Sequence, residues 1–311
     1  MQQTLFLRRL EEVLGPLAAA AIACMGADRR VGLWGNPLRG EPEESLASIS
    51  QQVPGVERTP WHAQAATAPP ESRTAITHSP LVDCGAVYVQ SLSSMLAPLA
   101  LGVQPGEEVL DLCAAPGGKT LHLAAALRGE GYLAAVEAVR GRFFKLKDNL
   151  ARCGAEGLVR LFQADGRDVG RKTPGRFDAV LLDAPCSSET RVDLRQSDAL
   201  GYWSEKKIAE SARKQKALLR SAIDATRPGG RVLYCTCTFA PEENELVVAH
   251  VLRRLKGKVG LEPIALPIAN QAPGLTHWRG KELPAELAHT ARVLPTDKMT
   301  GFFLALLRVI D

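Results

Sequence analysis

The stretch from Val109 to Thr120 constrains the fold of this 311-residue chain more than any other part of it. An apolar run ends in Asp111, a loop of small residues with two adjacent glycines follows, and an apolar-periodic run continues over 121–127. This order predicts a strand, a tight turn and the start of a helix. Such a junction lets a ligand approach the backbone, and the helix N-terminus favours an anionic group. The stretch therefore predicts a ligand site.

Strand-like and helix-like runs alternate along most of the chain after this junction. The expected strands are 108–112, 132–137, 159–163, 177–183 and 231–235, with 260–266 and 301–308 as last strands. The expected helices are 87–101, 119–127, 140–153, 205–226 and 241–255. This alternation is typical of a parallel sheet covered by helices on both faces. We therefore expect an α/β fold with a doubly wound, mostly parallel, seven-stranded Rossmann-like sheet.

The first 80 residues have a different pattern. Residues 2–26 have helical spacing of apolar positions, and Pro16 is expected to bend or break that helix. Residues 27–80 are rich in Gly, Pro, Ser, Gln and Glu, which predicts a loose polar connector. Their arginines are better explained as scattered solvated charge than as a defined patch. We expect a small N-terminal region over 1–80 and the main domain over 81–311.

Composition and charge exclude several classes of protein. The net charge of +4 is compatible with nucleic acid without requiring it. Seven cysteines at irregular spacing do not indicate a disulfide framework, so reduced thiols in a cytoplasmic protein are expected. No apolar run reaches the roughly 20 residues of a membrane-spanning helix. Residues 13–25 resemble a signal-peptide core, but Glu11 and Glu12 before them favour an alanine-rich helix.

Acidic residues follow three of the expected strands, at Glu137, Asp165 and Asp183. The carboxyl ends of parallel strands meet at one crevice, where an acid such as Glu137 can accept hydrogen bonds from ribose hydroxyls. The chain lacks a G-x-G-x-x-G at the first turn and a G-x-x-x-x-G-K-[ST] loop, which disfavours a dinucleotide or phosphate site. A nucleoside without phosphates that carries an amino-acid end fits better, and S-adenosylmethionine is such a ligand. The alternative is that these acids are caps or turn residues.

Two cysteines are expected to reach the same crevice. Cys186 follows Asp183, and Cys237 follows the next parallel strand. Thiolates are strong nucleophiles where their surroundings lower the pKa. Cys235 and Cys237 are spaced like half of a zinc site, but no second close pair of ligands completes it, so no metal is expected. Buried inert thiols remain the expectation for Cys24, Cys84 and Cys153. This reasoning leaves Cys186 and Cys237 as rival nucleophiles.

Several motifs, taken together and in this order, resemble the RNA cytosine-C5 methyltransferase family over residues 79–311. They are the segment from Gly85 to Met95, the loop from Cys113 to Thr120, Asp183-Ala184-Pro185-Cys186-Ser187, Pro228-Gly229-Gly230, the run from Thr236 to Glu245, Arg292-x-Leu294-Pro295 and Thr300-Gly301-Phe302-Phe303. Residues 1–78 match only weakly. The resemblance implies a Rossmann-like methyltransferase sheet with S-adenosylmethionine as cofactor and RNA as substrate.

The resemblance implies a cofactor role for each matching residue. The methionine end would lie against Cys113, Ala114, Ala115, Pro116, Gly117, Gly118 and Lys119. Glu137 would hold the ribose with Arg142 near it, and Asp165 would contact the adenine. Asp183 would touch both the cofactor and the target base.

The resemblance also assigns the two thiols. Cys237 would be the nucleophile and Cys186 would help to release the product, whereas Pro-Cys cysteines attack in related DNA enzymes. Cys235 stands where the family often has serine. Addition of a thiolate to carbon 6 of cytosine makes carbon 5 nucleophilic, which is covalent catalysis. Asp183 can support this step by stabilising added proton density at ring nitrogen 3.

We therefore expect an enzyme that forms 5-methylcytosine in RNA. Ribosomal RNA is favoured over transfer RNA, because no added transfer-RNA module follows the matched region, and substrate recognition would fall to residues 1–80. The alternatives are a transfer-RNA enzyme, a DNA cytosine methyltransferase and a non-catalytic RNA-binding assembly factor. The target base must be single-stranded or flipped. Arg191, Arg195, Tyr202 and Trp203 are candidates to stack on RNA bases, although Trp203 fits a core position equally well.

Overall fold

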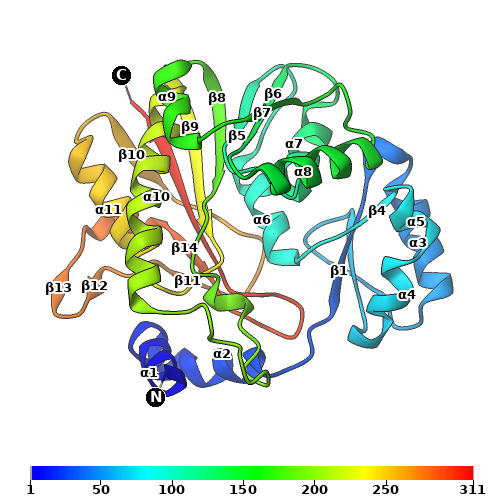
Figure 1. The fold of residues 1–311 in the computed structure, drawn as a ribbon, viewed down its shortest axis with the longest axis horizontal. Helices are drawn as coiled ribbons and strands as arrows, with labels where there is room; N and C mark the ends of the chain where they lie inside the picture. The colour runs from blue at the N-terminus through cyan, green and yellow to red at the C-terminus, as the bar shows by residue number, and fades with distance from the viewer. Residues whose placement is uncertain (1, 311) are drawn as a thin grey trace.

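The protein is described by a computed structural model of residues 2–310, built around one large, mostly parallel sheet (Figure 1). Its parallel strands are β5 (Glu108–Asp111), β6 (Tyr132–Glu137), β7 (Arg160–Gln163), β8 (Phe177–Asp183) and β9 (Thr226–Thr236). Antiparallel strands extend the sheet beyond β9, and they are β10 (Val259–Glu262), β11 (Gln271–Pro273), β14 (Ala291–Val293) and β15 (Phe302–Val309). The strand order is β11-β14-β15-β9-β8-β5-β6-β7, and β10 also pairs with β15. The predicted doubly wound α/β fold is confirmed.

The sheet holds nine strands within residues 2–310, two more than the seven expected. The two extra strands are short segments of the C-terminal region, β11 and β14. Each has three residues, too few to give a clear alternation of apolar and polar positions.

Helices cover both faces of the sheet, and the strand sequences explain why. Val109, Leu181 and Leu233 point to the face covered by α6 (Leu92–Leu101), α7 (Gly118–Leu127) and α8 (Arg140–Arg152). Their neighbours Leu110 and Val180 point to the other face, covered by α9 (Val169–Lys172), α10 (Glu205–Ala225) and α11 (Glu245–Arg254). A strand that is buried on both faces must be apolar at successive positions. These strands could be predicted from the sequence for that reason.

A second, antiparallel sheet is formed by residues that were expected to be a loose connector. Its order is β2-β3-β1-β4, from β1 (Val31–Gly35), β2 (Glu57–Arg58), β3 (Ala65–Ala68) and β4 (Val87–Val89). With α3 (Pro42–Gln52), α4 (Arg73–Thr77) and α5 (Pro80–Asp83) it encloses a separate core that includes Leu33, Leu46 and Ile49. The expectation of a polar connector over 27–80 is therefore wrong. The sheet also takes Val87–Val89, beyond the proposed boundary at residue 80.

Two expected helices begin later than predicted. The helix expected over 87–101 starts at Leu92, because Val87–Val89 pairs with β1 as a strand, in keeping with its β-branched and aromatic residues. The helix expected over 241–255 starts at Glu245. There the Asn244 side chain bonds Thr236 and the Thr238 carbonyl, which fixes a turn before the helix.

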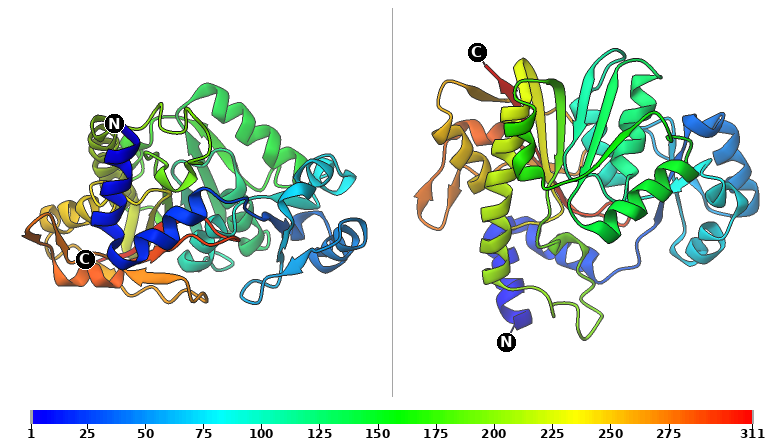
Figure 2. Two further views of the ribbon diagram at one scale, coloured as in Figure 1. Left: turned by 90° about the horizontal axis from the view of Figure 1, so that it is seen from below. Right: turned by 45° about the horizontal axis from the view of Figure 1, so that its top comes forward.

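The first two helices pack against the large domain rather than against the small sheet. They are α1 (Gln2–Leu14) and α2 (Ala18–Met25), separated by a turn at Gly15–Leu17 that contains Pro16, as predicted. Phe6 meets Trp203 edge to face with ring centroids 5.1 Å apart. Figure 2 shows α1 well apart from the small sheet in two further views. None of the helices in residues 2–310 has the length and hydropathy to cross a membrane.

This packing predicts a large stability effect at Phe6. Replacing Phe6 with alanine is expected to lower the free energy of unfolding by about 3–5 kcal/mol, because the ring is fully buried and a cavity would remain. Leu5, which is 41% exposed on the same helix, is the matched control, and its alanine variant should change stability by no more than about 0.5 kcal/mol. Urea denaturation measures both. Equal effects would contradict the docking of α1 on the large domain.

Candidate active site

The candidate site lies where the strand order reverses, between β5 and β8. From this point the sheet continues through β6 and β7 on one side and through β9 on the other, so the crevice opens at the carboxyl ends of β5 and β8. Asp111 ends β5 and Asp183 ends β8, while Glu137 ends β6. The topology therefore brings together two of the predicted acids, Glu137 and Asp183, and adds Asp111, which was not predicted as a site residue.

The loop that follows β5 is held close to its neighbours. Gly117, at φ 110°, forms the N-cap of α7 in a conformation that suits glycine. A Cβ on Gly118 would stand 2.5 Å from Gln90 Oε1 and 3.0 Å from a ring carbon of Tyr88, so a larger residue there would displace the Gln90 side chain. Arg142 Nη2 donates to the Ala115 carbonyl at 2.7 Å. The loop is thus positioned by side chains from two other elements.

Two buried carboxylate oxygens in the crevice have no hydrogen-bond partner within residues 2–310, Glu137 Oε2 and Asp111 Oδ1. Glu137 Oε1 accepts from the Val139 amide at 2.9 Å, and Asp111 Oδ2 accepts from Thr120 Oγ1 at 2.7 Å. Burial raises the pKa of Asp111 to about 7. Arg142 Nη1 stands 3.6 Å from Glu137 Oε2, an ion-pair contact that leaves this oxygen without a hydrogen bond. Buried acceptors without a hydrogen bond are costly, and hydroxyl or ammonium groups of a ligand would satisfy them. These two acceptors fit the ribose hydroxyls and the amine of S-adenosylmethionine.

The third predicted acid, Asp165, stands in a more open setting. It caps the short 3-10 turn Gly166–Asp168 and pairs with Arg167 at 2.6 Å. The Arg167 guanidinium holds the pKa of Asp165 below its usual range. Asp165 therefore has the capping role that was the alternative to ligand binding. The contact of Asp165 with adenine stays a prediction.

A test of the cofactor pocket follows from the unpartnered oxygen. Glu137→Gln is expected to weaken binding of S-adenosylmethionine by about 10- to 100-fold, because a charged acceptor for the ribose hydroxyls is lost. Isothermal titration calorimetry measures the change. Glu210→Gln, which changes an exposed glutamate on α10, is the matched control and should leave the affinity unchanged. Unchanged affinity in Glu137→Gln would place the cofactor elsewhere.

Lys119 links the loop to the strand that carries Asp183. Its Nζ lies 2.6 Å from Asp183 Oδ2 and donates to Ser94 Oγ at 2.7 Å. Burial lowers the pKa of Lys119, but the charges of Asp183 and Cys235 and the hydrogen bond to Asp183 together outweigh burial, and the pKa is raised. A fixed, charged ammonium therefore stands against the carboxylate predicted to meet the target base.

The two predicted thiols meet in the structure. Cys186 Sγ and Cys237 Sγ are 3.4 Å apart. The hydrogen bond from Cys186 lowers the pKa of Cys237 to about 6, and the charge of Arg191 acts in the same direction. The same contact raises the pKa of Cys186 well above its ordinary value. The charge of Arg191 and the hydroxyl of Ser188 act on Cys237 in particular, which favours Cys237 as the thiolate of the pair and Cys186 as the thiol.

Arg191 is a residue whose role the sequence reasoning missed. It was a candidate to stack on bases, yet the negative charge of Cys237 is the first cause of its raised pKa. Its neighbour Thr190 bonds the Cys237 carbonyl through Oγ1 at 3.1 Å. Its place four residues after the Asp183-to-Ser187 motif was the only signal for it in the sequence.

Two buried glutamates hold the cysteine loops together. Glu243 accepts from the Ser187 amide at 2.9 Å and from Gln215, and burial raises its pKa to about 7. Glu189 accepts from Thr238 Oγ1 and from Trp203 Nε1, each at 2.8 Å. Trp203 is thus a core anchor, which was one of its two expected roles.

Cys235 lies close to the site but faces Asp183. Its Sγ donates to Asp183 Oδ1 at 3.7 Å, and burial raises its pKa well above the ordinary value. Burial also raises the pKa of Cys113 well above its ordinary value. In the part of the chain from residue 2 to 310, no group of three or more His, Cys, Asp or Glu side chains is arranged to hold a metal ion.

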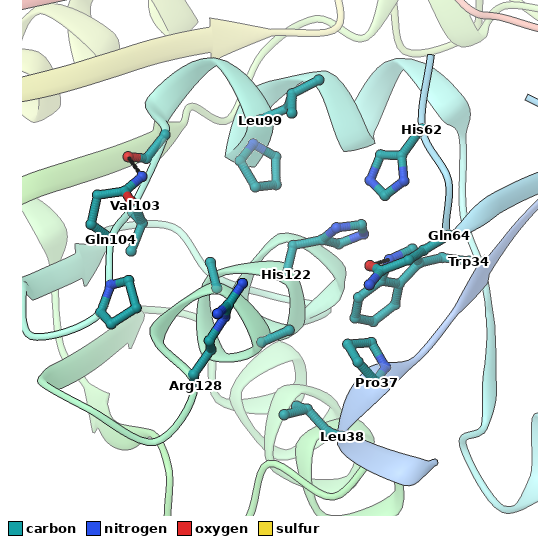
Figure 3. A pocket seen from close by; sticks show the side chains of 15 residues that line it. Trp34, Pro37, Leu38, His62, Gln64, Leu99, Val103, Gln104, His122 and Arg128 are labelled. Atoms are coloured by element: carbon teal, nitrogen blue, oxygen red, sulfur yellow. Dashed lines mark hydrogen bonds between the residues drawn. The ribbon is translucent and has the colours of Figure 1, made fainter. Parts of the chain in front are cut away.

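A cavity of about 600 Å³ lies elsewhere, between the small sheet and the ends of α6 and α7 (Figure 3). Trp34 and His122 stack in its wall with ring centroids 3.9 Å apart, and Arg128 stands across from them. None of the predicted site residues lines it. This cavity is therefore distinct from the crevice that holds the thiols.

Comparison with known proteins agrees with this geometry. A family model described as 16S rRNA methyltransferase RsmB/F matches residues 98–308, which is more than half of the chain. The chain belongs to this family. A methyltransferase homolog protein from Pyrococcus horikoshii has a related crystal structure, with a TM-score of 0.83 and 30% identity over 98% of this chain and 95% of that one. The Rossmann-like methyltransferase fold expected from the family resemblance is thereby confirmed.

Two curated relatives carry more specific names. The ribosomal RNA small subunit methyltransferase F of Vibrio vulnificus (strain YJ016) is 42% identical over 184 residues, covering 58% of this chain and 39% of that protein. The tRNA (cytosine(49)-C(5))-methyltransferase of Pyrococcus abyssi (strain GE5 / Orsay) is 37% identical over 225 residues, covering 72% of this chain and 70% of that protein. The chain thus spans about two fifths of the Vibrio protein.

Proposed function

We propose that this protein transfers a methyl group from S-adenosylmethionine to carbon 5 of a cytosine in RNA through a covalent bond between Cys237 and carbon 6. The observation that carries the proposal is the contact between the Cys186 and Cys237 sulfurs at 3.4 Å, near enough to Asp183 for its charge to act on the pKa of Cys237. Family membership supports the reaction class. A reduced pKa at Cys237 supplies a nucleophile at neutral pH.

The cofactor supplies an electrophilic methyl group when bound. Glu137 Oε2 and Asp111 Oδ1, which have no hydrogen bond, would hold its ribose and amine, and the loop from Cys113 to Lys119 would line its methionine end. Asp165 would receive the adenine, with Arg142 beside the ribose. These assignments use residues that end or follow adjacent strands of one sheet.

The residues of this chain would divide the work on the base. The Cys237 thiolate attacks carbon 6, and carbon 5 then becomes nucleophilic. As the sulfur adds to carbon 6, ring nitrogen 3 takes up a proton from solvent, and the carboxylate of Asp183, held by Lys119 at 2.6 Å, would accept a hydrogen bond from the new N–H group. After methylation a solvent water takes the proton from carbon 5, and the electron pair of that C–H bond forms the double bond between carbons 5 and 6 again. The bond between carbon 6 and sulfur breaks at the same time and returns the Cys237 thiolate, to which the Cys186 thiol donates a hydrogen bond. The proton on ring nitrogen 3 then returns to solvent.

We propose ribosomal RNA as the substrate, in keeping with the description of the family and with the name of the Vibrio relative. Transfer RNA is the second candidate, because the Pyrococcus abyssi relative, of which the chain covers 70%, is named for it. The test incubates the protein and S-adenosylmethionine with unmodified small-subunit ribosomal RNA or with a transfer-RNA pool, followed by bisulfite sequencing. One protected cytosine in the ribosomal RNA is expected. Protection of a cytosine only in transfer RNA would make transfer RNA the substrate. Protection in neither RNA would favour a non-catalytic RNA-binding role.

A further inference from the structure

Ser188 adopts a backbone conformation that is unusual for a residue with a side chain. Its φ of 58° and ψ of 32° lie in the left-handed region. Arg128 and Arg279 are the other non-glycine residues with positive φ in residues 2–310, and neither belongs to the cysteine loops. This conformation suits glycine and costs other L-residues, so its occurrence in a reactive loop suggests that the side chain has a use.

The loop around Ser188 is fixed on both sides. Before it, the Ser187 amide donates to Glu243 Oε1 at 2.9 Å. After it, the Thr190 amide donates to the Cys237 carbonyl at 3.3 Å, and the Arg191 amide donates to the Ser188 carbonyl at 2.9 Å. These bonds hold the left-handed residue in place and fix the direction of its side chain.

That side chain lies between the two thiols. With Cys237 protonated, its thiol donates to Ser188 Oγ at 3.5 Å, and Ser188 Oγ also lies 3.9 Å from Cys186 Sγ. Loss of the thiol proton leaves the Cys237 sulfur as an acceptor only, so the hydroxyl must then turn its hydrogen toward it. A thiol is a weak donor, whereas a hydroxyl is a stronger one, and a hydrogen bond to a charged acceptor is stronger than one to a neutral acceptor. With Cys237 ionised, the hydroxyl is therefore well suited to donate to its sulfur.

We propose that Ser188 is a third member of the nucleophile site, whose hydroxyl donates a hydrogen bond to Cys237 Sγ and holds this sulfur as the attacking thiolate. The inference rests on the proposed function for the identity of the attacking sulfur. No proton changes place in this contact, because the hydroxyl keeps its hydrogen while the sulfur carries the charge. The bond also lowers the pKa of Cys237, in the same direction as the contact with Cys186.

Two variants distinguish the effect of the Ser188 hydroxyl from the effect of its backbone conformation. Ser188→Ala removes the hydroxyl and keeps a side chain in the left-handed region, whereas Ser188→Gly removes the hydroxyl and relieves the backbone. Ser187→Ala is the matched control, because the Ser187 hydroxyl contacts Glu243 and Thr238 and not the sulfurs.

The test is the rate of iodoacetamide alkylation of Cys237 between pH 5 and 9 without RNA, read by mass spectrometry with fragmentation that distinguishes Cys237 from Cys235. Both Ser188 variants are expected to raise the midpoint of the curve of alkylation rate against pH by about one pH unit. This shift slows alkylation at pH 6 by about fivefold. Ser187→Ala should leave the midpoint unchanged. Ser188→Gly should have the higher Tm of the two Ser188 variants.

Two results would overturn the proposal. One is an unchanged midpoint in both Ser188 variants, and the other is a shift in Ser188→Gly alone, which would assign the effect to the backbone. Because alkylation needs neither RNA nor cofactor, it distinguishes this inference from the proposed function. A wild-type protein that alkylates as expected but transfers no methyl group would contradict the function alone.

Discussion

Replacing Cys237 with alanine is expected to reduce methyl transfer to RNA by at least about 10³-fold, because carbon 5 of cytosine gains its nucleophilicity only when a thiolate adds to carbon 6. The side chain is small and nearly buried, so the variant should fold and keep its cofactor affinity. Transfer of a labelled methyl group, measured as an initial rate at saturating cofactor, gives the effect. Cys84→Ala, which alters an exposed thiol of the small sheet region, is the control and should retain full activity.

Retention of activity within tenfold in Cys237→Ala would contradict the assignment of the nucleophile. It would favour Cys186, as expected of a DNA-type enzyme in which the Pro-Cys cysteine attacks. Unchanged binding of S-adenosylmethionine by the variant shows that the loss comes from chemistry and not from unfolding.

Replacing Cys186 with alanine is expected to trap the protein on its RNA. Without the thiol at 3.4 Å, the departing sulfur loses its hydrogen-bond donor and the bond between Cys237 and carbon 6 breaks slowly. The same donor lowers the pKa of Cys237, so its removal raises that pKa and the thiolate forms at higher pH. The assay is therefore run at pH 8.5, where a denaturing gel should show a slowly migrating complex of protein and RNA.

The outcome that contradicts this role is equally visible on the gel. A complex formed by Cys237→Ala and absent from Cys186→Ala would exchange the roles of the two cysteines. Multiple turnover by Cys186→Ala at the wild-type rate, with no complex, would remove Cys186 from product release.

The large sheet could be predicted from the sequence and the small sheet could not, for physical reasons. Strands such as Phe177–Asp183 are buried on both faces and are apolar at successive positions. Ala65–Ala68 is short and built from small residues, and its register with Val31–Trp34 joins segments more than 30 residues apart. Neither local propensity nor periodicity reveals such a pairing.

Some features of the candidate site could likewise be predicted from the sequence and others could not. Topology alone brings Asp183, Cys186 and Cys237 to one crevice, because they follow adjacent strands of a parallel sheet. The contacts of Arg191 and Ser188 depend on the path of an irregular loop, which no periodic pattern encodes. Lys119 was expected to face the cofactor, but its ion pair with Asp183 depends on the side-chain direction at the first turn of α7.

The most direct test of the account is the position of the covalent bond between protein and RNA. In the complex trapped by Cys186→Ala, nuclease and protease digestion followed by mass spectrometry is expected to find a modified cytosine on Cys237, and the variant with both cysteines replaced should give no complex. A cytosine found on Cys235 or Cys113 instead, or a complex that persists without Cys237, would contradict the proposal that the sulfur of Cys237 attacks the base.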